Sequence, residues 1–389
     1  MNTYKLILSV AGLLFVGALV LFFAENFVLA GPMLIAFFVA VAIGFRGYEL
    51  TKGFSYTMMI FAAVTTALCY PQYFLTIGTY KLTGLITPLI QIIMFGMGTE
   101  MGLKDFSGVI KMPKAVLIGL AGHFTFMPLV GFALAKAFNF PPEIAAGVVL
   151  IGSMPCGLAS NVMSYLAKAN LALSITLTAV ATLLAPFLTP MWMKILGGQF
   201  IEVNALAMMF DIIKMVIIPI GAGLVFNRLF KGKIAWLDKA MPILSMVGIA
   251  LIIVVITASG RNNLLLIGPA LILCALIHNT TGYTFGYWMG RAFKLSERDS
   301  RTIAIEVGMQ NGGLASGLAK EMGKAATLGL APAVFGPLMN ITGSILASYW
   351  HRKPIEDELG LGSLESEVPS LKPEAGSQRS EVGVRKSEV

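Results

Sequence analysis

A carboxylate, two amides and three glycines occur together in the segment 301–316 of this 389-residue chain, inside a run that is otherwise largely apolar. A carboxylate near the centre of a bilayer costs about 2.5 to 3.5 kcal/mol and is kept only where it pairs, faces water or holds an ion. Glu306 is therefore a functional candidate. Gln310 follows it at i+4, so on a continuous helix the two side chains share a face. The glycines weaken that helix and free backbone carbonyls to coordinate, which predicts a broken membrane helix around a polar site.

A second polar group lies upstream, beside another predicted helix break at residues 154–161. Ser160 and Asn161 follow the proline and glycine of this break, and Ser174 and Thr178 are spaced i and i+4 on the next apolar span. With Glu306 they can bring hydroxyl, amide and carboxylate oxygens to one point, which suits a hard cation such as Na⁺. The alternative is that the two hydroxyls only bond to backbone carbonyls or hold helices together.

The composition indicates a polytopic membrane protein. Hydrophobic residues make up 57% of the chain and charged residues 12%, with a mean hydropathy of +0.81, too apolar for a soluble surface. The net charge of +8 comes from lysines and arginines in short loops, where they act as orientation signals. Nucleic acid is therefore not an expected partner. The loop charges predict that both termini are cytoplasmic and that the protein lies in the cell (inner) membrane.

About twelve apolar segments are long enough to span a membrane or to form part of a span. They lie near 5–24, 31–46, 55–76, 82–101, 115–137, 142–168, 170–196, 206–229, 240–259, 265–292, 298–321 and 326–350. The residues that follow, 351–389, are rich in Ser, Glu, Gly and Pro and predict a disordered cytoplasmic tail.

An internal repeat relates the two halves of the chain. The tetrapeptide GLAS at 157–160 recurs at 313–316, and His123 corresponds to His278, 155 residues later. The offset covers five spans, and an odd number of crossings inverts the second copy, which is the plan of many secondary transporters. We expect additional N-terminal spans at 1–53, a first five-helix repeat at 54–196 and an inverted second repeat at 206–350.

Several longer motifs resemble those of the bile acid/sodium symporter family, over about residues 94–350. They are IIMFGMG (92–98), ASNVMSYLAKANLALS (159–174), APFLTP (185–190), IEVGMQN (305–311) and NITGSILASYW (340–350). The resemblance implies an all-α fold of ten core spans, divided into a panel domain and a core domain, with two crossing discontinuous helices. It also implies Na⁺-coupled uptake of an organic anion. Two N-terminal spans exceed that pattern.

The resemblance also implies roles for individual residues. The first sodium site would be formed by Ser160, Asn161, Ser174, Thr178 and Glu306. The second would use Glu306, Gln310 and the carbonyls of Val307 and Met309. The substrate would contact Asn311, Asn340 and the first break at Leu158 and Ala159.

The chain departs from the family pattern at two of these places. Bacterial members carry glutamine in the second sodium site where this chain has His123, and threonine before A-S-N where it has Leu158. His123 either packs as a buried histidine or belongs to the second ion site, in which case transport is expected to depend on pH. Leu158 removes a hydroxyl from the substrate crevice.

We therefore expect a monomeric sodium symporter that works by alternating access in a lipid bilayer, with Na⁺ as the coupling ion. The imported organic anion would be bile-acid-like, a keto or hydroxy acid, or a sulfonate, because the N-termini of half-helices favour negative charge. One alternative is an intramembrane enzyme that uses Glu306 and His123 as acid and base, although no HExxH or GxSxG motif supports it. A channel or a sensor is the third possibility.

Overall fold

The structure is a computed structural model that describes residues 3–48, 51–102, 105, 107–230 and 235–353. The tail expected at 351–389 lies outside the described residues from residue 354 onward. The last described helix ends at His351.

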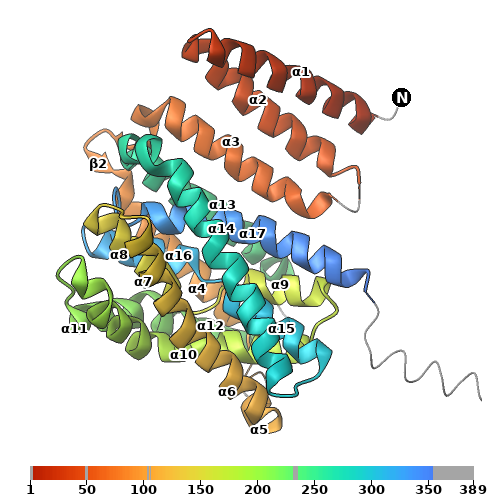
Figure 1. The fold of residues 1–389 in the computed structure, drawn as a ribbon, viewed down its shortest axis with the longest axis vertical. Coiled ribbons are helices and arrows are strands. Elements are labelled where there is room, and N and C mark those ends of the chain that lie inside the picture. Colours follow the sequence, from red (N-terminus) through yellow and green to blue (C-terminus); the bar gives the residue numbers. More distant parts are fainter. Residues whose placement is uncertain (1–2, 49–50, 103–104, 106, 231–234, 354–389) are drawn as a thin grey trace, which may run out of the picture. The chain divides into compact units, whose positions relative to one another are not determined.

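Helices make up almost all of the described chain (Figure 1). Those up to the first break are α1 (Thr3–Phe23), α2 (Phe27–Phe45), α3 (Ser55–Cys69), α4 (Ile86–Glu100), α5 (Gly108–Lys111), α6 (Pro113–Ala121), α7 (Met127–Ala137) and α8 (Pro142–Gly152). Those after it are α9 (Ala159–Leu166), α10 (Leu171–Ile195), α11 (Ala205–Ile212), α12 (Ile218–Phe230), α13 (Ala235–Ser259), α14 (Arg261–Ala292), α15 (Glu297–Gly308), α16 (Gly312–Glu321) and α17 (Leu330–His351).

Short elements complete the chain. One π-helical turn, Gly122–Phe126, joins α6 to α7, and another, Ile213–Ile217, joins α11 to α12. Strands β1 (Thr76–Ile77) and β2 (Tyr80–Lys81) form an antiparallel hairpin. The 3₁₀ turns are Lys52–Phe54, Pro71–Phe74, Leu82–Leu85 and Gly197–Gln199.

The expectation of an all-helical polytopic membrane protein is confirmed. Among the described residues, eight helical segments are long and apolar enough to cross a membrane, and three shorter apolar helices accompany them. The first two candidates, α1 and α2, bury only 11% and 28% of their most apolar windows within the protein. Their remaining apolar surface would cost free energy in water, so a lipid environment accounts for it.

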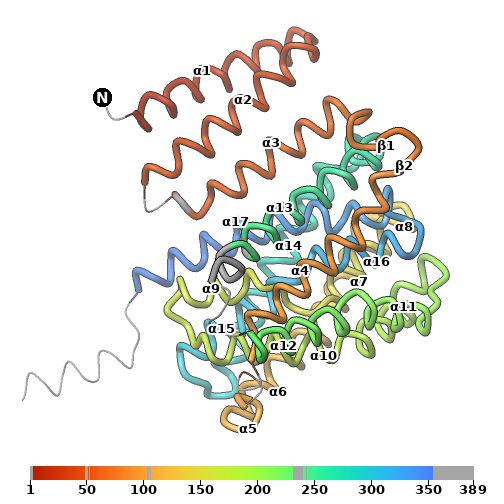
Figure 2. The backbone as a smooth tube through the Cα atoms, turned by 180° about the vertical axis from the view of Figure 1, so that it is seen from behind, coloured from red at the N-terminus to blue at the C-terminus, as the bar shows by residue number. Residues whose placement is uncertain are grey.

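The N-terminal helices pack in sequence order. Helix α1 contacts α2, α2 contacts α3, and α3 contacts α13, which in turn contacts α4. Figures 1 and 2 show α1, α2 and α3 side by side in both views. The remaining helices gather around two broken helices, α8–α9 and α15–α16.

The first halves of both broken helices form the most deeply buried part of the structure. Every residue from Ile144 to the end of α8 is buried, and so is every residue from Ser300 to the end of α15. Pro155 lies in the first break, where its missing N–H and its ring prevent the helix from continuing. The second break is shorter, and Asn311 ends it by capping α16 through the N–H of Leu314 at 2.9 Å. One expectation was wrong here: α15 ends at Gly308, so Gln310 lies in the break rather than on the helical face of Glu306.

The two breaks bond directly to each other. Cys156 and Gln310 form an isolated antiparallel bridge, and the backbone N–H of Asn311 donates to the carbonyl of Pro155 at 2.7 Å. Backbone groups freed by the interruption of one helix are thus satisfied by the other, as a buried backbone requires.

The start of each broken helix is held by the opposite half of the chain. Glu143, in the first turn of α8, pairs with Lys324 and accepts a hydrogen bond from Thr327 at 2.6 Å. Asp299, in the first turn of α15, accepts from the side chain of Asn170 at 2.7 Å. These contacts fix the two broken helices at both ends of the buried core.

Helices α4 and α12 approach so closely that their glycines are required. A Cβ atom at Gly223 would lie 2.3 Å from the carbonyl oxygen of Phe95, whereas a Cβ atom at Gly221 would meet no atom within 4 Å. We expect Gly223→Ala to force the backbones apart and to destabilise the protein by about 1 to 3 kcal/mol. Gly221→Ala is the matched control. The measurement is the apparent melting temperature of both variants in detergent, and equal melting temperatures would contradict the prediction.

Candidate functional site

Five oxygen-bearing side chains converge beside the first break, and we call them the oxygen cluster: Ser160, Asn161, Ser174, Thr178 and Glu306. The Glu306 carboxylate is the centre, and only 1% of this residue is exposed. The hydroxyl of Ser174 donates to its Oε1 atom, and the hydroxyl of Thr178 donates to its Oε2 atom at 3.0 Å. The structure therefore brings together the whole set that the sequence analysis assigned to a first sodium site.

The oxygen cluster has more acceptor atoms than protons. The Ser174 hydroxyl lies within reach of both Glu306 and the amide oxygen of Asn161, the latter at 2.8 Å, but it carries a single proton. Thr178 is in the same position, 3.3 Å from that amide oxygen. The proton of Ser160 goes to the carbonyl of Gly157 at 2.8 Å. Unpaired oxygen lone pairs around a buried carboxylate form a site that a hard cation would satisfy.

The two hydroxyls on α10 do not bond to backbone carbonyls, but they link α10 to α9 and α15, so the alternative of holding helices together agrees with the structure as well as an ion site does. Ser174 and Thr178 point their hydroxyls at the side chains of Asn161 and Glu306. Their neighbours behave differently: Thr176 donates to the carbonyl of Ala172 and Thr182 to the carbonyl of Thr178, each one turn back. Residue type alone therefore does not separate the site hydroxyls from the structural ones: Thr176 lies on another face of α10, and Thr182 lies on the same face one turn beyond Thr178.

The register of α10 against α15 follows from contacts at their first turns. The backbone N–H of Asn170 donates to the hydroxyl of Thr302 at 2.9 Å, and the Asn170 side chain caps α10. Ser174 lies one turn after Asn170, and Glu306 lies one turn after Thr302. Because both helices rise by about 5.4 Å per turn, aligning their starts aligns the hydroxyl with the carboxylate.

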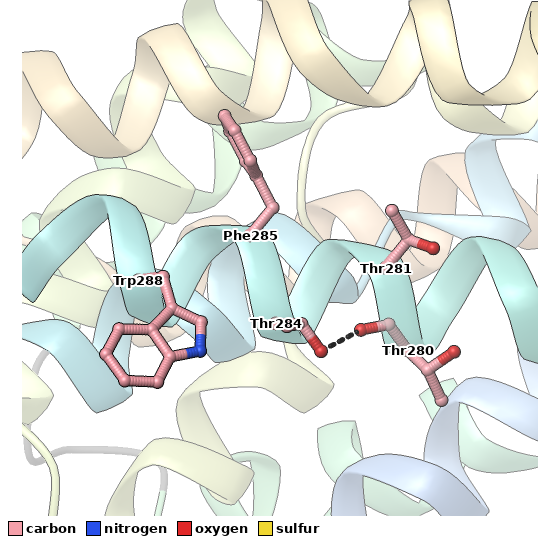
Figure 3. Close-up of a pocket in the computed structure, with 5 residues that line it drawn as sticks. All are labelled: Thr280, Thr281, Thr284, Phe285 and Trp288. Atoms are coloured by element: carbon pink, nitrogen blue, oxygen red, sulfur yellow. Dashed lines mark hydrogen bonds between the residues drawn. The ribbon is translucent and has the colours of Figure 1, made fainter.

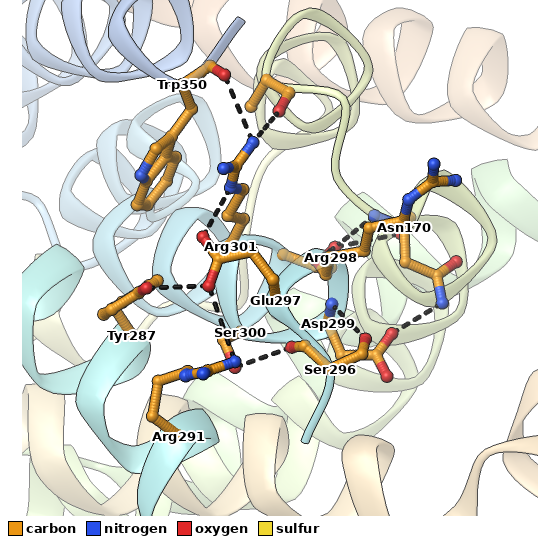
Figure 4. A network of polar contacts seen from close by, with 12 residues as sticks. Asn170, Tyr287, Arg291, Ser296, Glu297, Arg298, Asp299, Ser300, Arg301 and Trp350 are labelled. Atoms are coloured by element: carbon orange, nitrogen blue, oxygen red, sulfur yellow. Dashed lines mark hydrogen bonds and ion pairs between the residues drawn. The ribbon is translucent and has the colours of Figure 1, made fainter. Parts of the chain in front are cut away.

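Arg301 joins α15 to the ends of two other helices (Figure 4). It is 2% exposed, and its Nε atom donates to Glu297 at 2.8 Å. Its Nη1 atom donates to the carbonyls of Ala167 and Trp350 at 3.3 and 3.2 Å, at the ends of α9 and α17. A cation is favourable at a helix C-terminus, and here one guanidinium serves two. The sequence analysis gave Arg301 no individual role and missed these contacts.

Residues of the predicted second sodium site lie on the opposite side of the break. The Gln310 side chain donates to the carbonyl of Val307 at 2.7 Å, while its amide oxygen is buried without a hydrogen-bond partner. The Met309 N–H donates to the carbonyl of Ile305. His123 places Nδ1 3.0 Å from the carbonyl oxygen of Glu306 and Nε2 2.6 Å from that of Met154. That this group binds an ion stays a prediction.

The predicted substrate contacts lie at or near the breaks. Leu158, Ala159 and Asn311 are all partly exposed there, whereas the neighbouring Ser160 and Gln310 are buried. Asn340 is partly exposed on α17. Substrate binding by these four residues stays a prediction.

Cys156 is a neighbour of the oxygen cluster that sequence reasoning did not find. Its thiol interacts with the Glu306 carboxylate and with Thr178. It lies in the apolar context of the first break, where a cysteine is usually a small buried hydrophobe. Only the bridge between the two breaks brings it to the carboxylate.

The structure also has an open cavity of about 460 Å³ on the side of α14 (Figure 3). It is lined by Thr280, Thr281, Thr284, Phe285 and Trp288, and none of these belongs to the oxygen cluster. The hydroxyl of Thr284 donates to the carbonyl of Thr280 at 2.8 Å. Its polar lining is therefore engaged in part by the helix itself.

The residue types favour a monovalent or other hard ion over a transition metal. Within the part of the chain that the structure describes, no three His, Cys, Asp or Glu side chains gather in a metal-binding group. Transition metals are held by such nitrogen and sulfur ligands. The oxygen cluster instead offers hydroxyl, amide and carboxylate oxygens, which Na⁺ accepts.

Comparison with known proteins agrees with this chemistry. The profile of the Sodium Bile acid symporter family matches residues 87–267. The chain is 37% identical over 308 residues to the uncharacterized sodium-dependent transporter YocS of Bacillus subtilis, covering 79% of this chain and 93% of that protein. It is 34% identical over 271 residues to the probable chloroplastic sodium/metabolite cotransporter BASS1 of Arabidopsis thaliana, covering 69% of this chain and 68% of that protein.

Removal of one cluster hydroxyl should weaken Na⁺ binding. Thr178→Val keeps the shape of the side chain but deletes a hydroxyl that contacts Glu306 and Asn161. We expect the Na⁺ concentration for half-maximal thermal stabilisation to rise about tenfold, which is about 1.4 kcal/mol. Thr182→Val is the matched control, since that hydroxyl bonds only to the backbone one turn back. Equal Na⁺ titrations for the two variants would show that Thr178 is not a ligand.

The two arginines that contact Glu297 should differ in their effect on stability. Arg301 is buried, whereas the side chain of Arg291 is 33% exposed and lies 3.6 Å from the same carboxylate. Arg301→Gln removes a buried ion pair and the donor that satisfies the carbonyls of Ala167 and Trp350, and is expected to cost about 3 to 5 kcal/mol. Arg291→Gln is expected to cost less than about 1 kcal/mol. Thermal unfolding in detergent measures both, and a larger loss for Arg291→Gln would refute the assignment.

Proposed function

The chain belongs to the sodium bile acid symporter family, and from this premise we propose that it imports an organic anion together with Na⁺ by alternating access. The observation that carries the proposal is the oxygen cluster, in which a buried carboxylate meets two hydroxyls and an amide at the interruption of a helix. Interrupted helices of secondary transporters hold the coupling ion in this way. The names of the relatives, which mention sodium, support the same coupling ion.

The alternative of an intramembrane enzyme is set aside, because the family is one of transporters. The site has the same implication. Both ring nitrogens of His123 face backbone carbonyls rather than the Glu306 carboxylate. An acid–base pair would need the two side chains within reach of a common substrate atom.

We propose twelve membrane-crossing segments, of which α1 and α2 precede two inverted repeats of five. The first repeat comprises α3, α4, α6–α7, α8–α9 and α10, and the second comprises α11–α12, α13, α14, α15–α16 and α17. Support comes from the matched anchors: the first turn of α8 bonds to Thr327, and the first turn of α15 bonds to Asn170. In this scheme α3, α4, α11–α12 and α13 form a panel domain, and the remaining helices of both repeats form the core domain that holds the site.

The orientation follows from the loop charges. We propose a cell-membrane location with both termini in the cytoplasm, since lysines and arginines concentrate in alternate short loops. Twelve crossings, an even number, agree with termini on one side.

The substrate class follows from the helix starts at the breaks. Helices α9 and α16 both begin there, so their positive dipole ends favour an anion. Leu158 and Ala159 at the start of α9 are apolar and partly exposed. We propose a carboxylate or sulfonate with an apolar part, such as a bile-acid-like compound or a keto or hydroxy acid, in contact with Asn311 and Asn340.

Reconstituted protein should accumulate organic anions only with an inward Na⁺ gradient. In proteoliposomes we expect uptake to fall to background when Na⁺ is replaced by K⁺, and Glu306→Gln to abolish it because the variant lacks the charge that holds the ion. Gln91→Ala on α4 is the control outside the oxygen cluster, because the Gln91 side chain donates only to the backbone of Lys214. Uptake that ignores the Na⁺ gradient would refute coupling, and steady conductance without substrate would favour a channel.

A further inference from the structure

Two backbone carbonyls, one in the last turn of α15 and one in the first break, point at the same side chain. Because α15 ends at Gly308, the carbonyl of Glu306 does not receive the helical hydrogen bond from the N–H of Gln310, which lies 3.2 Å from the sulfur of Met339 instead. The second carbonyl belongs to Met154 in the first break. The first lies in the last turn of α15 and the second follows the end of α8, and the C-terminal ends of helices carry partial negative charge. Such a convergence of carbonyl oxygens is where a cation would be expected.

A side chain of the protein occupies that place. His123 is 2% exposed, and its two ring nitrogens lie 3.0 and 2.6 Å from the carbonyl oxygens of Glu306 and Met154. It lies in the π-helical turn Gly122–Phe126 between α6 and α7. Such turns occur often at functional sites, where the extra residue in the turn alters the direction of its neighbours.

The ring leaves too few oxygens for an ion. A hard cation takes about six oxygens at about 2.3 to 2.6 Å, and an ion at that distance from the Glu306 carbonyl would press against the ring nitrogen. The carbonyl of Val307 is engaged by the Gln310 side chain at 2.7 Å. The amide oxygen of Gln310, a side-chain ligand of the predicted second site, is buried without a hydrogen-bond partner.

We infer that His123 takes the place of a second cation between the two breaks, so that the protein binds a single sodium ion per cycle, in the oxygen cluster. The inference rests on the proposed function and specifies its stoichiometry. The ring lies between the two carbonyls at all times and donates to both of them as imidazolium or to one of them as neutral imidazole, whereas an ion would link them only while bound. His123 thus determines how many ions the transport cycle uses.

The corresponding histidine of the second half provides a comparison within the same molecule. His278 lies 155 residues after His123 and is fully buried on α14. Neither of its ring nitrogens has a hydrogen-bond partner. Its Nε2 atom lies 3.1 Å from where a Cβ atom of Gly152 would be, at the end of α8. It does not link two breaks, so it serves as the matched control.

Equilibrium binding of radioactive ²²Na⁺ to the purified full-length protein in detergent tests the inference. We expect about one ion per wild-type molecule, about two per His123→Gln molecule, because the amide supplies an oxygen and vacates the ring volume, and about one per His278→Gln molecule. His123→Asn is the second variant should the glutamine variant not elute as a single species. Glu306→Gln should bind none.

Two results would overturn the inference. One is saturation at two ions in the wild type, and the other is saturation at one ion in both His123 variants. If the wild type binds no Na⁺, or if Glu306→Gln leaves its Na⁺ binding unchanged, both the proposed function and this inference fail. If the wild type binds two Na⁺ ions and Glu306→Gln abolishes this binding, the proposed function stands and only the role of His123 is refuted.

Discussion

The burial of one carboxylate constrains most of this structure. Glu306 lies in the part of the protein where every neighbouring residue of α15 is buried, and an uncompensated carboxylate is costly there. The protein compensates it with hydroxyls from α10 and a thiol from the first break, and the amide oxygen of Asn161 on α9 contacts the same two hydroxyls. Three separate elements must therefore keep a fixed register against α15. That requirement explains why polar contacts concentrate at the ends of these elements.

Different contacts at the helix ends fix the register of the elements around α15. On one side Asn170 sets the register of α10 by bonding to Thr302 and Asp299. On the other side Arg301 holds the ends of α9 and α17 against α15 through two carbonyls. Between these two sets of contacts the core consists of apolar and small side chains, with glycines where helix backbones approach each other. Apolar packing alone is not specific about register in a membrane, whereas directional hydrogen bonds are, so the polar ends define the position of the site.

The two interrupted helices bring polar backbone groups, with their partial charges, into the buried core. Each break exposes carbonyls at the end of one half-helix and N–H groups at the start of the next, and the bond between Asn311 and Pro155 satisfies part of them. What is left over has a sign: negative at the ends of α8 and α15, positive at the starts of α9 and α16. The proposed coupling of Na⁺ to an organic anion follows from these opposite signs, since the same pair of breaks would hold both ions.

Much of this could be predicted from the sequence, because its strongest signals are local. Hydropathy indicated the helical membrane protein, and Pro155, Gly157 and Gly308 indicated the breaks. The cost of a buried charge singled out Glu306. The motifs indicated the residues of the oxygen cluster. What depended on contacts between distant segments could not be predicted. The pairing of Gln310 with Cys156, the role of Arg301 and the different surroundings of His123 and His278 were decided by tertiary structure, because hydrogen-bond partners more than a hundred residues apart leave no periodic trace in the chain.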